Sequence, residues 1–319
     1  MTTILPAVSV LMPVYNAKKY IKAAVESIIT QEFTSFEFII INDGSTDGTL
    51  KILEAYAKKD HRIRLISREN KGLIASLNEG LDLAQAPLIA RMDADDIALE
   101  TRLSEQVAYL ADHSDVVCVG SFFEIIDEKN RGLTILEAPT VNADIQQELI
   151  KGHSVICHPS AIMRKDAVLK VGKYREKYHP AEDLDLWLRL GEVGLLSNIP
   201  KTLMKYRVLN SSISGIAGEK QLATARKVIG SACERRRVVS TFEPTIHFRP
   251  DETIESKYDF ILKYGWWAFN YKNKTAAIVY GIKAVKICPL NKKSWQLLYC
   301  AIFKMIKQKK SIDVTKRFE

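Results

Sequence analysis

Short apolar runs alternate with segments of helical periodicity over residues 1–120, and this alternation restricts the fold more than any other feature of the chain. The runs have the length of buried strands. They cover residues 8–13, 36–41, 63–66, 87–92 and 116–120. The segments between them repeat apolar side chains at helical spacing, as at Leu73, Leu77 and Leu81. Repeated strand–helix units predict an α/β fold with a Rossmann-like, mostly parallel sheet and helices on both faces.

Acidic residues follow two of these runs directly. Asp43 comes after the run at 36–41, and Asp93, Asp95 and Asp96 come after the run at 87–92. In open parallel sheets, ligands bind outside the carboxyl ends of the strands. We therefore expect these carboxylates to lie on the same rim of the sheet, although they are far apart in the sequence.

The cluster Asp93-Ala94-Asp95-Asp96 is the sharpest chemical feature. Carboxylates this close together repel one another unless a cation or solvent relieves the repulsion. Hard divalent cations such as Mg²⁺ and Mn²⁺ prefer oxygen ligands and keep substrate phosphates in their shell. The alternative is a solvated acidic turn that caps the next helix. The position directly after an apolar strand favours the metal site.

Three further motifs lie on the predicted rim. Tyr15, after Pro13, is placed to stack on a planar base. Asp43 can accept a hydrogen bond from a base N–H, and Gly44 lets a ligand approach closely. Lys71, or the helix N-terminus that it precedes, can contact phosphate. The simpler alternatives are an aromatic side chain at the core edge, a plain turn and a loop at a helix start.

A second acidic site is Glu182-Asp183, at the start of a predicted helix. A carboxylate near an acceptor hydroxyl can serve as a general base. Trp187 lies four residues beyond Asp183 and shares its helical face, where core packing is its expected role. The alternative for the two acidic residues is a favourable position in a first helical turn.

Beyond residue 120 the pattern is less regular. Residues 122–126 and 131–135 suggest a hairpin, and 202–208 a short strand near the sheet edge. From about Lys220 onward the chain is predicted to be all helix, including a helical hairpin with Pro289 at its turn. We place a soft boundary near residue 217.

The formal net charge of +8 suggests anionic partners. Nucleic acid is disfavoured, because the acidic clusters on the predicted rim would repel phosphate in the absence of a metal ion. Lys304, Lys307, Lys309 and Lys310, with Arg235–Arg237, could instead face anionic lipid, and solvated basic helix faces are the alternative. The five scattered cysteines, without CxxC, favour a reducing, cytoplasmic compartment. No apolar stretch is long enough to predict a membrane-spanning helix.

Taken together, these motifs resemble the family 2 glycosyltransferases. The resemblance rests on residues 8–16, 41–49, 70–72, 92–96, 158–160 and 181–189, in the family's order and approximate spacing. It implies a GT-A catalytic domain at 1–217, with a donor half at about 1–120 and an acceptor half at about 121–217. The helical region 218–319 lies outside the catalytic resemblance. The implied activity is inverting transfer of a sugar from a nucleotide-sugar, usually a UDP-sugar, to a glycan or lipid-linked acceptor in cell-surface polysaccharide synthesis.

The resemblance also implies roles for individual residues. Pro13, Tyr15 and Asp43 would hold the base, and Asp93 the ribose or sugar. Asp95, with Asp96 nearby, would bind Mn²⁺ or Mg²⁺. Asp183, paired with Glu182, would be the general base. One departure concerns the segment 206–214, where many relatives carry a histidine and this chain has Leu209, which cannot ligate a metal.

Other classes of protein fit less well. A dehydrogenase or another nucleotide enzyme would need a glycine-rich loop after the first strand or a Walker motif, and neither is present. A nucleotidyltransferase, and a non-catalytic scaffold that keeps the fold, stay open as alternatives. Peripheral contact at the inner face of the cell membrane would suit a lipid-linked acceptor.

Overall fold

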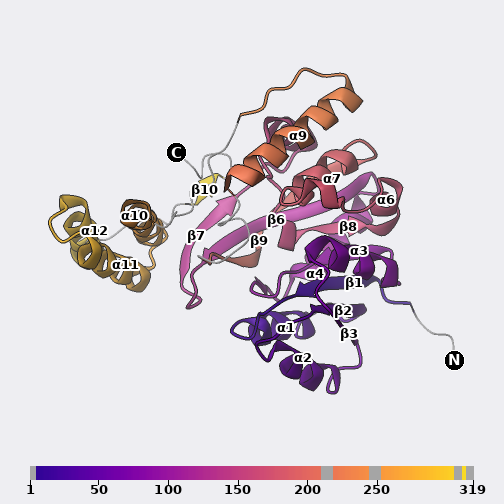
Figure 1. The fold of residues 1–319 in the computed structure, drawn as a ribbon, viewed down its shortest axis with the longest axis horizontal. Helices are drawn as coiled ribbons and strands as arrows, with labels where there is room; N and C mark the ends of the chain where they lie inside the picture. Colours follow the sequence, from indigo (N-terminus) through magenta and orange to yellow (C-terminus); the bar gives the residue numbers. More distant parts are fainter. Residues whose placement is uncertain (1–4, 210–217, 244–252, 305–310, 314–319) are drawn as a thin grey trace.

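The computed structural model describes residues 5–209, 218–243, 253–304 and 311–313. Its strands form one sheet in the order β10-β7-β6-β8-β4-β1-β2-β3, with β9 beside β6 and β5 beside β9 (Figure 1). The strands are β1 (Val8–Val14), β2 (Phe36–Asp43), β3 (Ile63–Arg68), β4 (Leu88–Arg91), β5 (Ile97–Ala98), β6 (Val116–Ile126), β7 (Gly132–Glu137), β8 (Ile162–Arg164), β9 (Leu195–Arg207) and β10 (Ile312–Asp313).

Helices connect and cover these strands (Figure 1). They are α1 (Ile21–Ile29), α2 (Thr49–Ala57), α3 (Leu73–Leu83), α4 (Arg102–Asp112), α5 (Asn142–Lys151), α6 (Lys165–Lys170), α7 (Glu182–Leu190), α9 (Gly218–Arg236), α10 (Ile254–Asn270), α11 (Lys274–Ile287) and α12 (Lys292–Phe303). Two short 3-10 turns, η1 (His158–Ser160) and η2 (Glu176–Tyr178), precede β8 and α7.

Strands β1 to β4 form the parallel core of the sheet. β1 lies between β2 and β4, with Val8 opposite Phe36 on one side and Leu88 on the other. Every residue of β1 is buried. Because side chains of a strand point alternately to the two faces, complete burial means that both faces are covered. The predicted mostly parallel α/β sheet is therefore confirmed.

The hairpin expected after residue 120 is present as β6 and β7, which pair antiparallel. The runs at 116–120 and 122–126 are one continuous strand, however, and not two. The strand expected at 202–208 is also longer, since β9 begins at Leu195 and runs parallel to β6. Its first half carries Ser197 and Asn198, whose side chains donate to backbone carbonyls at 3.0 and 2.8 Å. These buried polar residues break the apolar pattern that would have marked the strand.

The prediction that the chain is all helix beyond residue 220 is wrong in one place. β10 pairs parallel with β7, so the chain returns to the sheet after α12. A strand of two residues is too short to show periodicity in a sequence. The boundary expected near residue 217 falls outside the described residues.

The C-terminal helices divide into two groups. Helix α9 packs on α5 and α7. Helices α10–α12 pack on one another as a helical lobe beside β7 (Figure 1). Within this lobe, α11 and α12 form the predicted hairpin, with Pro289 at the turn.

Hydrogen bonds join the helical lobe to the β6–β7 hairpin. Asn273 Nδ2 donates to the carbonyl of Gly132 at 2.8 Å, and the Tyr280 hydroxyl donates to Asp127 Oδ2 at 3.3 Å. Among the described residues, no helix combines the length and the apolar character needed to cross a bilayer. All five cysteines lie in the described part of the chain and form no disulfide.

Candidate active site

A cavity of about 800 Å³ opens at the carboxyl ends of β1, β2 and β4. It brings together most of the residues predicted for the site. Those on its wall are Pro13, Tyr15, Asp43, Asp93, Asp95, Glu182 and Asp183. Lys71 and Asp96 are not among the described residues that line it. The carboxylates expected on one rim of the sheet do lie there.

The Asp43 carboxylate, at the end of β2, is held by the backbone of the next loop. Lys71 N donates to Oδ1 at 2.8 Å, Gly72 N donates to Oδ2 at 2.9 Å, and Arg68 forms an ion pair with Oδ1. A carboxylate offers about four acceptor positions, so these three contacts leave one of them for a further donor. Lys71 thus contacts Asp43 through its backbone, while its side chain is exposed and is not among the described groups that line the cavity.

The loops after β1 and β2 are fastened to each other. Asn16 N donates to Ser45 Oγ at 2.9 Å, and Thr46 N donates to Asn16 Oδ1 at 2.8 Å. Gly44 has a φ of +75°, and an added Cβ there would lie 2.7 Å from a backbone nitrogen of the loop at 70–72. Glycine is therefore required at this close approach. Tyr15 projects beside these loops with 55% of its surface exposed, which leaves its ring available for stacking.

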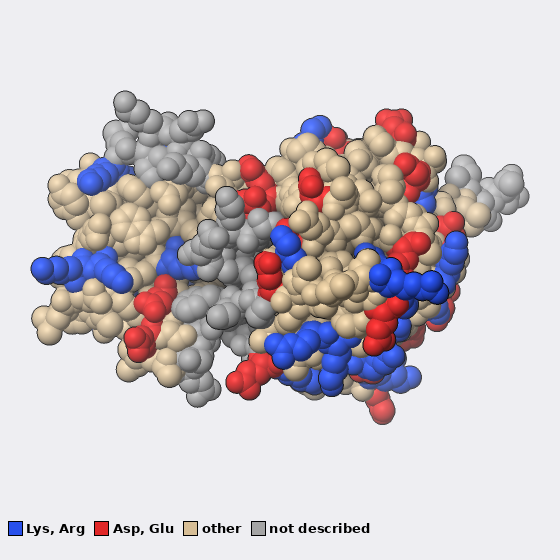
Figure 2. Space-filling view, turned by 90° about the horizontal axis from the view of Figure 1, so that it is seen from above, with Lys and Arg blue, Asp and Glu red and all other residues tan. Residues whose placement is uncertain are grey.

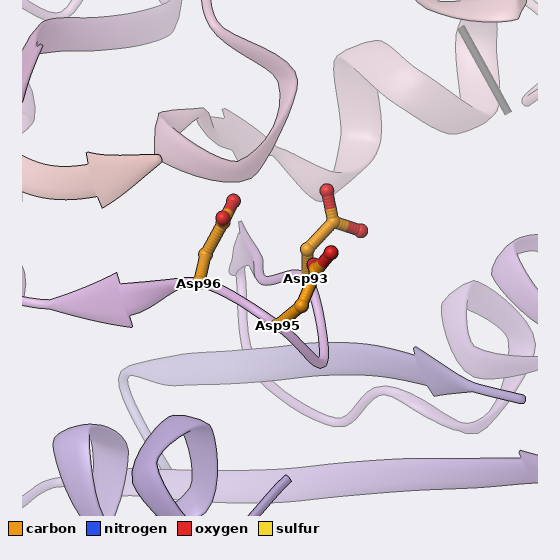
Figure 3. Close-up of side chains that lie close together, drawn as sticks. All are labelled: Asp93, Asp95 and Asp96. Atoms are coloured by element: carbon orange, nitrogen blue, oxygen red, sulfur yellow. The ribbon is translucent and has the colours of Figure 1, made fainter. Parts of the chain in front are cut away.

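The side chains of Asp93, Asp95 and Asp96 share the space after β4 (Figure 3). One carboxylate oxygen of each lies within 4.8 Å of the others. Burial, reinforced by the charge of Asp93, raises the pKa of Asp95 to about 6. Burial and the charges of both neighbours raise the pKa of Asp96 well above its usual range. A cation at this position would relieve the repulsion and keep the carboxylates ionised.

The donor set fits a divalent cation. Asp96 Oδ1 accepts from Arg207 N at 2.7 Å, while its Oδ2 is buried without a hydrogen bond from the described residues. Asp93 and Asp95 line the cavity, and Asp96 is buried behind them. Oxygen-only ligation of this kind suits Mg²⁺ or Mn²⁺. Asp95 offers an oxygen from the cavity side, and Asp96 offers its unbonded oxygen from the buried side.

Two buried arginines hold the acidic loop in place, and sequence reasoning missed both. Arg91 forms an ion pair with Asp93 from the end of β4. Arg207, at the end of β9, donates from Nε to the Asp95 carbonyl at 2.7 Å and from Nη1 to the Asp127 carbonyl at 2.9 Å. Both arginines also line the cavity. The sequence did offer one indication of their role, since each arginine is the charged last residue of an otherwise largely apolar strand.

The acidic pair at the start of α7 faces the same cavity. Asp183 Oδ2 accepts from Ser154 Oγ at 3.0 Å, and its Oδ1 accepts from Leu184 N at 2.7 Å. Burial, with the charge of Glu182, raises the pKa of Asp183 to about 6. Glu182 Oε2 is bonded to His179 Nδ1 at 3.1 Å. A carboxylate with a pKa just below neutrality suits a general base, because it is ionised and yet can accept a proton.

His158 lines the cavity as well, and the buried Trp187 packs against it. The His158 Nε2 atom lies 2.8 Å from the Tyr174 hydroxyl. Burial lowers the pKa of His158 well below its usual value, as does the nearby Arg91, so its imidazole is neutral. Trp187 meets the His158 ring edge to face at 5.8 Å between centroids and is completely buried. The expectation that Trp187 packs in the core is confirmed.

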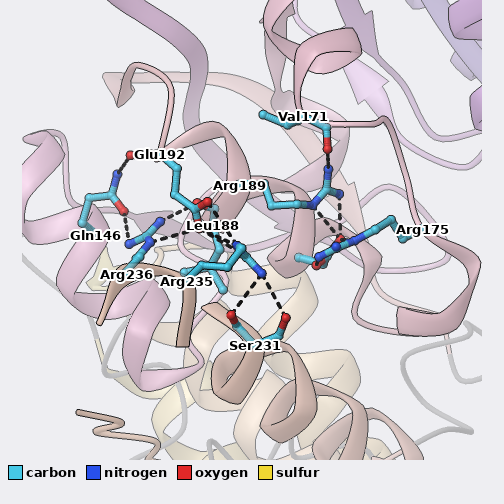
Figure 4. A network of polar contacts seen from close by, with 11 residues as sticks. Gln146, Val171, Arg175, Leu188, Arg189, Glu192, Ser231, Arg235 and Arg236 are labelled. Carbon is cyan, nitrogen blue, oxygen red and sulfur yellow. Dashed lines mark hydrogen bonds and ion pairs between the residues drawn. The ribbon is translucent and has the colours of Figure 1, made fainter. Parts of the chain in front are cut away.

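Arginine–carboxylate contacts fix α7 on its far side (Figure 4). Asp185, two residues beyond Asp183, is bound by both Arg175 and Arg189. Arg189 also donates to the Val171 carbonyl at 2.6 Å. Asp185 is engaged in this network and is not among the described residues that line the cavity, so the acidic pair Glu182 and Asp183 is what α7 presents there.

Figure 4 also shows two of the basic residues considered for lipid contact, Arg235 and Arg236. Arg235 and Arg236 bind Glu192, at 2.8 and 3.3 Å, and so fasten α9 beside α7. Their guanidinium groups therefore serve an internal contact rather than a free basic face. Lys307, Lys309 and Lys310 lie outside the described residues.

The helical lobe also contributes to the cavity, which the sequence did not reveal. Phe260, Lys263, Tyr264 and Trp267 of α10 line its wall. Lys263 Nζ lies 5.4 Å from the centroid of the Trp267 ring. Leu209 lines the cavity too, and its side chain offers no ligand atom. Asp93 and Asp95 line the same cavity and do offer oxygen atoms that could ligate a metal.

Comparisons with known sequences identify relatives of this chain. Residues 9–172 match the model of the glycosyl transferase family 2 domain. The chain is 37% identical over 235 residues to an uncharacterized glycosyltransferase of Haemophilus influenzae, covering 70% of this chain and 72% of that relative. It is 32% identical over 213 residues to the O-antigen biosynthesis glycosyltransferase WbnJ of Escherichia coli, covering 66% of this chain and 82% of the relative.

Solved structures share the fold at low sequence identity. S. aureus TarS 1–349 in complex with UDP-GlcNAc matches with a TM-score of 0.58 and 18% identity, covering 94% of this chain and 93% of that chain. The mannosyltransferase PcManGT from Pyrobaculum calidifontis, in complex with GDP-Man and Mn²⁺, matches with a TM-score of 0.56 and 17% identity, covering 96% and 82%.

Proposed function

Because the chain belongs to glycosyltransferase family 2, we propose that it moves a sugar from a nucleotide-sugar, preferably a UDP-sugar, to a hydroxyl group with inversion at the anomeric carbon. The observation that carries the proposal is the shared cavity. Asp43, the acidic loop at 93–96 and Asp183 reach it from separate elements. This combination supplies a nucleotide contact, a cation site and a base within one space.

The donor occupies the rim of β1, β2 and β4. Tyr15 and Pro13 contact the base, and the open acceptor position of Asp43 receives a base N–H. Asp93 contacts the ribose or the sugar. A divalent ion held by Asp95 and Asp96 would neutralise charge on the diphosphate as it leaves. The neighbours bound to UDP-GlcNAc and to GDP-Man with Mn²⁺ support this donor class.

The transfer is a direct displacement. Asp183 takes the proton of the acceptor hydroxyl, whose oxygen forms a bond to the anomeric carbon. The bond from that carbon to the diphosphate oxygen breaks, and the nucleoside diphosphate departs with the electron pair. Attack from the face opposite the leaving group inverts the configuration. Glu182 raises the proton affinity of Asp183 through its negative charge.

The acceptor enters on the α10 side of the cavity. Aromatic side chains such as Trp267 and Tyr264 suit the apolar faces of sugar rings or a lipid-linked glycan. The O-antigen relative supports a role in cell-surface polysaccharide synthesis. We propose a cytoplasmic location, with peripheral contact at the inner face of the cell membrane where such acceptors are assembled.

A thermal-shift panel tests the donor site. The protein is heated with UDP, GDP, UDP-GlcNAc or GDP-Man, each with Mn²⁺ and with EDTA. A ligand at a hundred times its dissociation constant stabilises the folded state by about 2.7 kcal/mol. We expect such a rise in melting temperature with a UDP-sugar, and a larger rise with Mn²⁺ than with EDTA.

A second measurement separates the alternatives. Release of nucleoside diphosphate from the stabilising donor, in the presence of a cell-envelope glycolipid extract, supports transfer. A folded protein that shows no shift with any nucleotide is a non-catalytic scaffold. Release of pyrophosphate from a nucleoside triphosphate and a sugar phosphate indicates a nucleotidyltransferase instead.

A further inference from the structure

The positive charge of the chain is concentrated in residues 260–319. This segment holds 13 of the 46 Lys and Arg residues but only 2 of the 38 Asp and Glu residues. The other 259 residues carry 33 basic and 36 acidic side chains. Residues 260–312 contain no Asp or Glu at all. The net charge of +8 is thus a property of the helical lobe and the residues after it, and not of the catalytic sheet.

The same region exposes large apolar side chains at helical spacing. Trp295, Tyr299 and Phe303 follow one another every four residues along α12, so they share one face. Their exposed fractions are 54%, 57% and 70%. The rings of Tyr299 and Phe303 lie 5.2 Å apart. We call this the α12 face, and its members are Trp295, Tyr299, Ile302 and Phe303.

Lysines surround the α12 face. Lys292 and Lys293 are exposed at the start of α12, and Lys304 is exposed at its end. Leu290, in the turn before α12, is 98% exposed. Figure 2 shows basic and acidic side chains and broad uncharged surface on the lobe. The acidic residues of α10–α12, Glu255 and Asp259, both lie near the start of α10. An exposed aromatic stripe with lysines around it is thus the outer surface of α12.

Membrane lipid matches both parts of this surface. Aromatic rings gain free energy at the level of the lipid headgroups, and lysines are attracted to anionic lipids. The phosphates of a nucleic acid could pair with the lysines, but Phe303, Ile302 and Leu290 would stay exposed to water. Isolated exposed apolar residues are ordinary on a protein surface, but a stripe within an acid-free basic segment is not.

We propose that the α12 face docks on the anionic surface of a lipid bilayer. The lobe lies in the interfacial plane through Trp295, Tyr299 and Phe303, while the flanking lysines contact lipid phosphates. Helix α10 of the same lobe lines the cavity. Docking therefore attaches to the lipid surface the same lobe that forms one wall of the cavity. The docking itself is independent of the proposed transfer reaction and can be tested without a nucleotide.

Vesicle flotation of the full chain tests the docking. Vesicles of phosphatidylcholine alone are compared with vesicles that also contain phosphatidylglycerol. We expect binding to the anionic vesicles, and binding that weakens as salt screens the charges. The double variant Lys292→Gln/Lys293→Gln should weaken it on the order of tenfold. Removal of two positive charges from a helix N-terminus does not destabilise the helix, so this loss would not reflect unfolding.

A second variant tests the aromatic part. Tyr299→Ser/Phe303→Ser should weaken binding on the order of tenfold or more, since both rings lose their place in the interface. Matched controls lie outside the helical lobe. Lys58→Gln/Lys59→Gln removes two adjacent exposed lysines near the end of α2, and Val239→Ser removes an apolar side chain that is 87% exposed. Both controls should bind vesicles as the wild type does.

Three outcomes would overturn the proposal. The first is the absence of binding to anionic vesicles. The second is binding to single-stranded RNA that depends on Lys292 and Lys293 but not on Tyr299 and Phe303, with vesicles ignored. The third is a wild-type oligomer that Tyr299→Ser/Phe303→Ser dissociates while vesicle binding is unchanged, which would assign the α12 face to a second copy of the chain.

Discussion

Replacing Asp183 by asparagine should stabilise the protein while it removes activity. The wild-type carboxylate carries a charge that its buried position disfavours, which raises its pKa from 3.8 to about 6. A pKa change of this size corresponds to about 3 kcal/mol between the charged and neutral forms. The side chain faces a water-accessible cavity and receives two hydrogen bonds, so we expect about 1–2 kcal/mol of added stability at neutral pH.

The pH dependence of this gain follows from the sign of the pKa change. Between pH 3.8 and about 6 the folded wild type binds more protons at Asp183 than the unfolded chain does. Stability from this group is therefore present at low pH and is lost as the pH rises through about 6. The asparagine side chain that replaces Asp183 does not titrate. The variant should match the wild type near pH 4 and exceed it above pH 6, by about 2–4 °C in melting temperature.

Activity should move in the opposite direction. Loss of a general base slows a reaction by about 100- to 10,000-fold. The assay is release of nucleoside diphosphate from the donor that stabilises the protein, and the thermal melts are recorded in EDTA so that no metal shifts the charges. Wild-type activity should fall about tenfold for each pH unit below 6, as Asp183 takes up a proton.

Asp185→Asn is the matched control on the same helix. Its carboxylate binds Arg175 and Arg189, so this variant should lose about 3 kcal/mol of stability instead of gaining any. An Asp183→Asn protein that melts below the wild type at pH 8 would contradict the burial argument. Wild-type turnover by Asp183→Asn would show that another group removes the proton.

Three further variants separate the parts of the donor site. Asp95→Asn should lose the Mn²⁺-dependent part of the nucleotide thermal shift and keep the EDTA part; an intact Mn²⁺ effect would remove Asp95 from the cation site. Asp43→Asn should lose the nucleotide shift both with Mn²⁺ and with EDTA, because its ligand-facing acceptor is gone; unchanged nucleotide affinity by calorimetry would contradict the base contact. Arg207→Met should lower the free energy of unfolding in urea by about 3 kcal/mol and weaken Mn²⁺ binding, since the carbonyls of Asp95 and Asp127 lose a charged donor. A normal Mn²⁺ titration of a folded Arg207→Met protein would show that the loop needs no such support.

The rim of the site could be predicted from the sequence because its residues directly follow recognisable strands. Asp43 and Asp93 each follow an apolar strand, and parallel strands place their carboxyl ends together. The start of a helix at Glu182 could likewise be predicted from the neighbouring residues alone. The role of Lys71 was not visible, since its backbone N–H, and not its ammonium group, contacts Asp43.

The support of the site could not be predicted, because its partners are distant in sequence. Arg207 binds the backbone of Asp95 and the carboxylate of Asp96, which lies 111 positions away. No periodicity within β9 indicates that contact. Trp267 and Tyr264 were recognised as helical residues, but their place in the cavity wall depends on how α10 packs on β7. Such packing is a property of the assembled fold.

Asp127 has a practical consequence for any shortened form of the enzyme. Its carboxylate accepts from Tyr280 of the helical lobe, and its carbonyl accepts from Arg207, which also binds Asp95. A fragment that stops at residue 243 would keep every recognisable motif of the family. It would nevertheless lose the hydroxyl donor of Tyr280, the aromatic wall of α10 and the return strand β10. Kinetic constants measured on that fragment would therefore differ from those of the full chain.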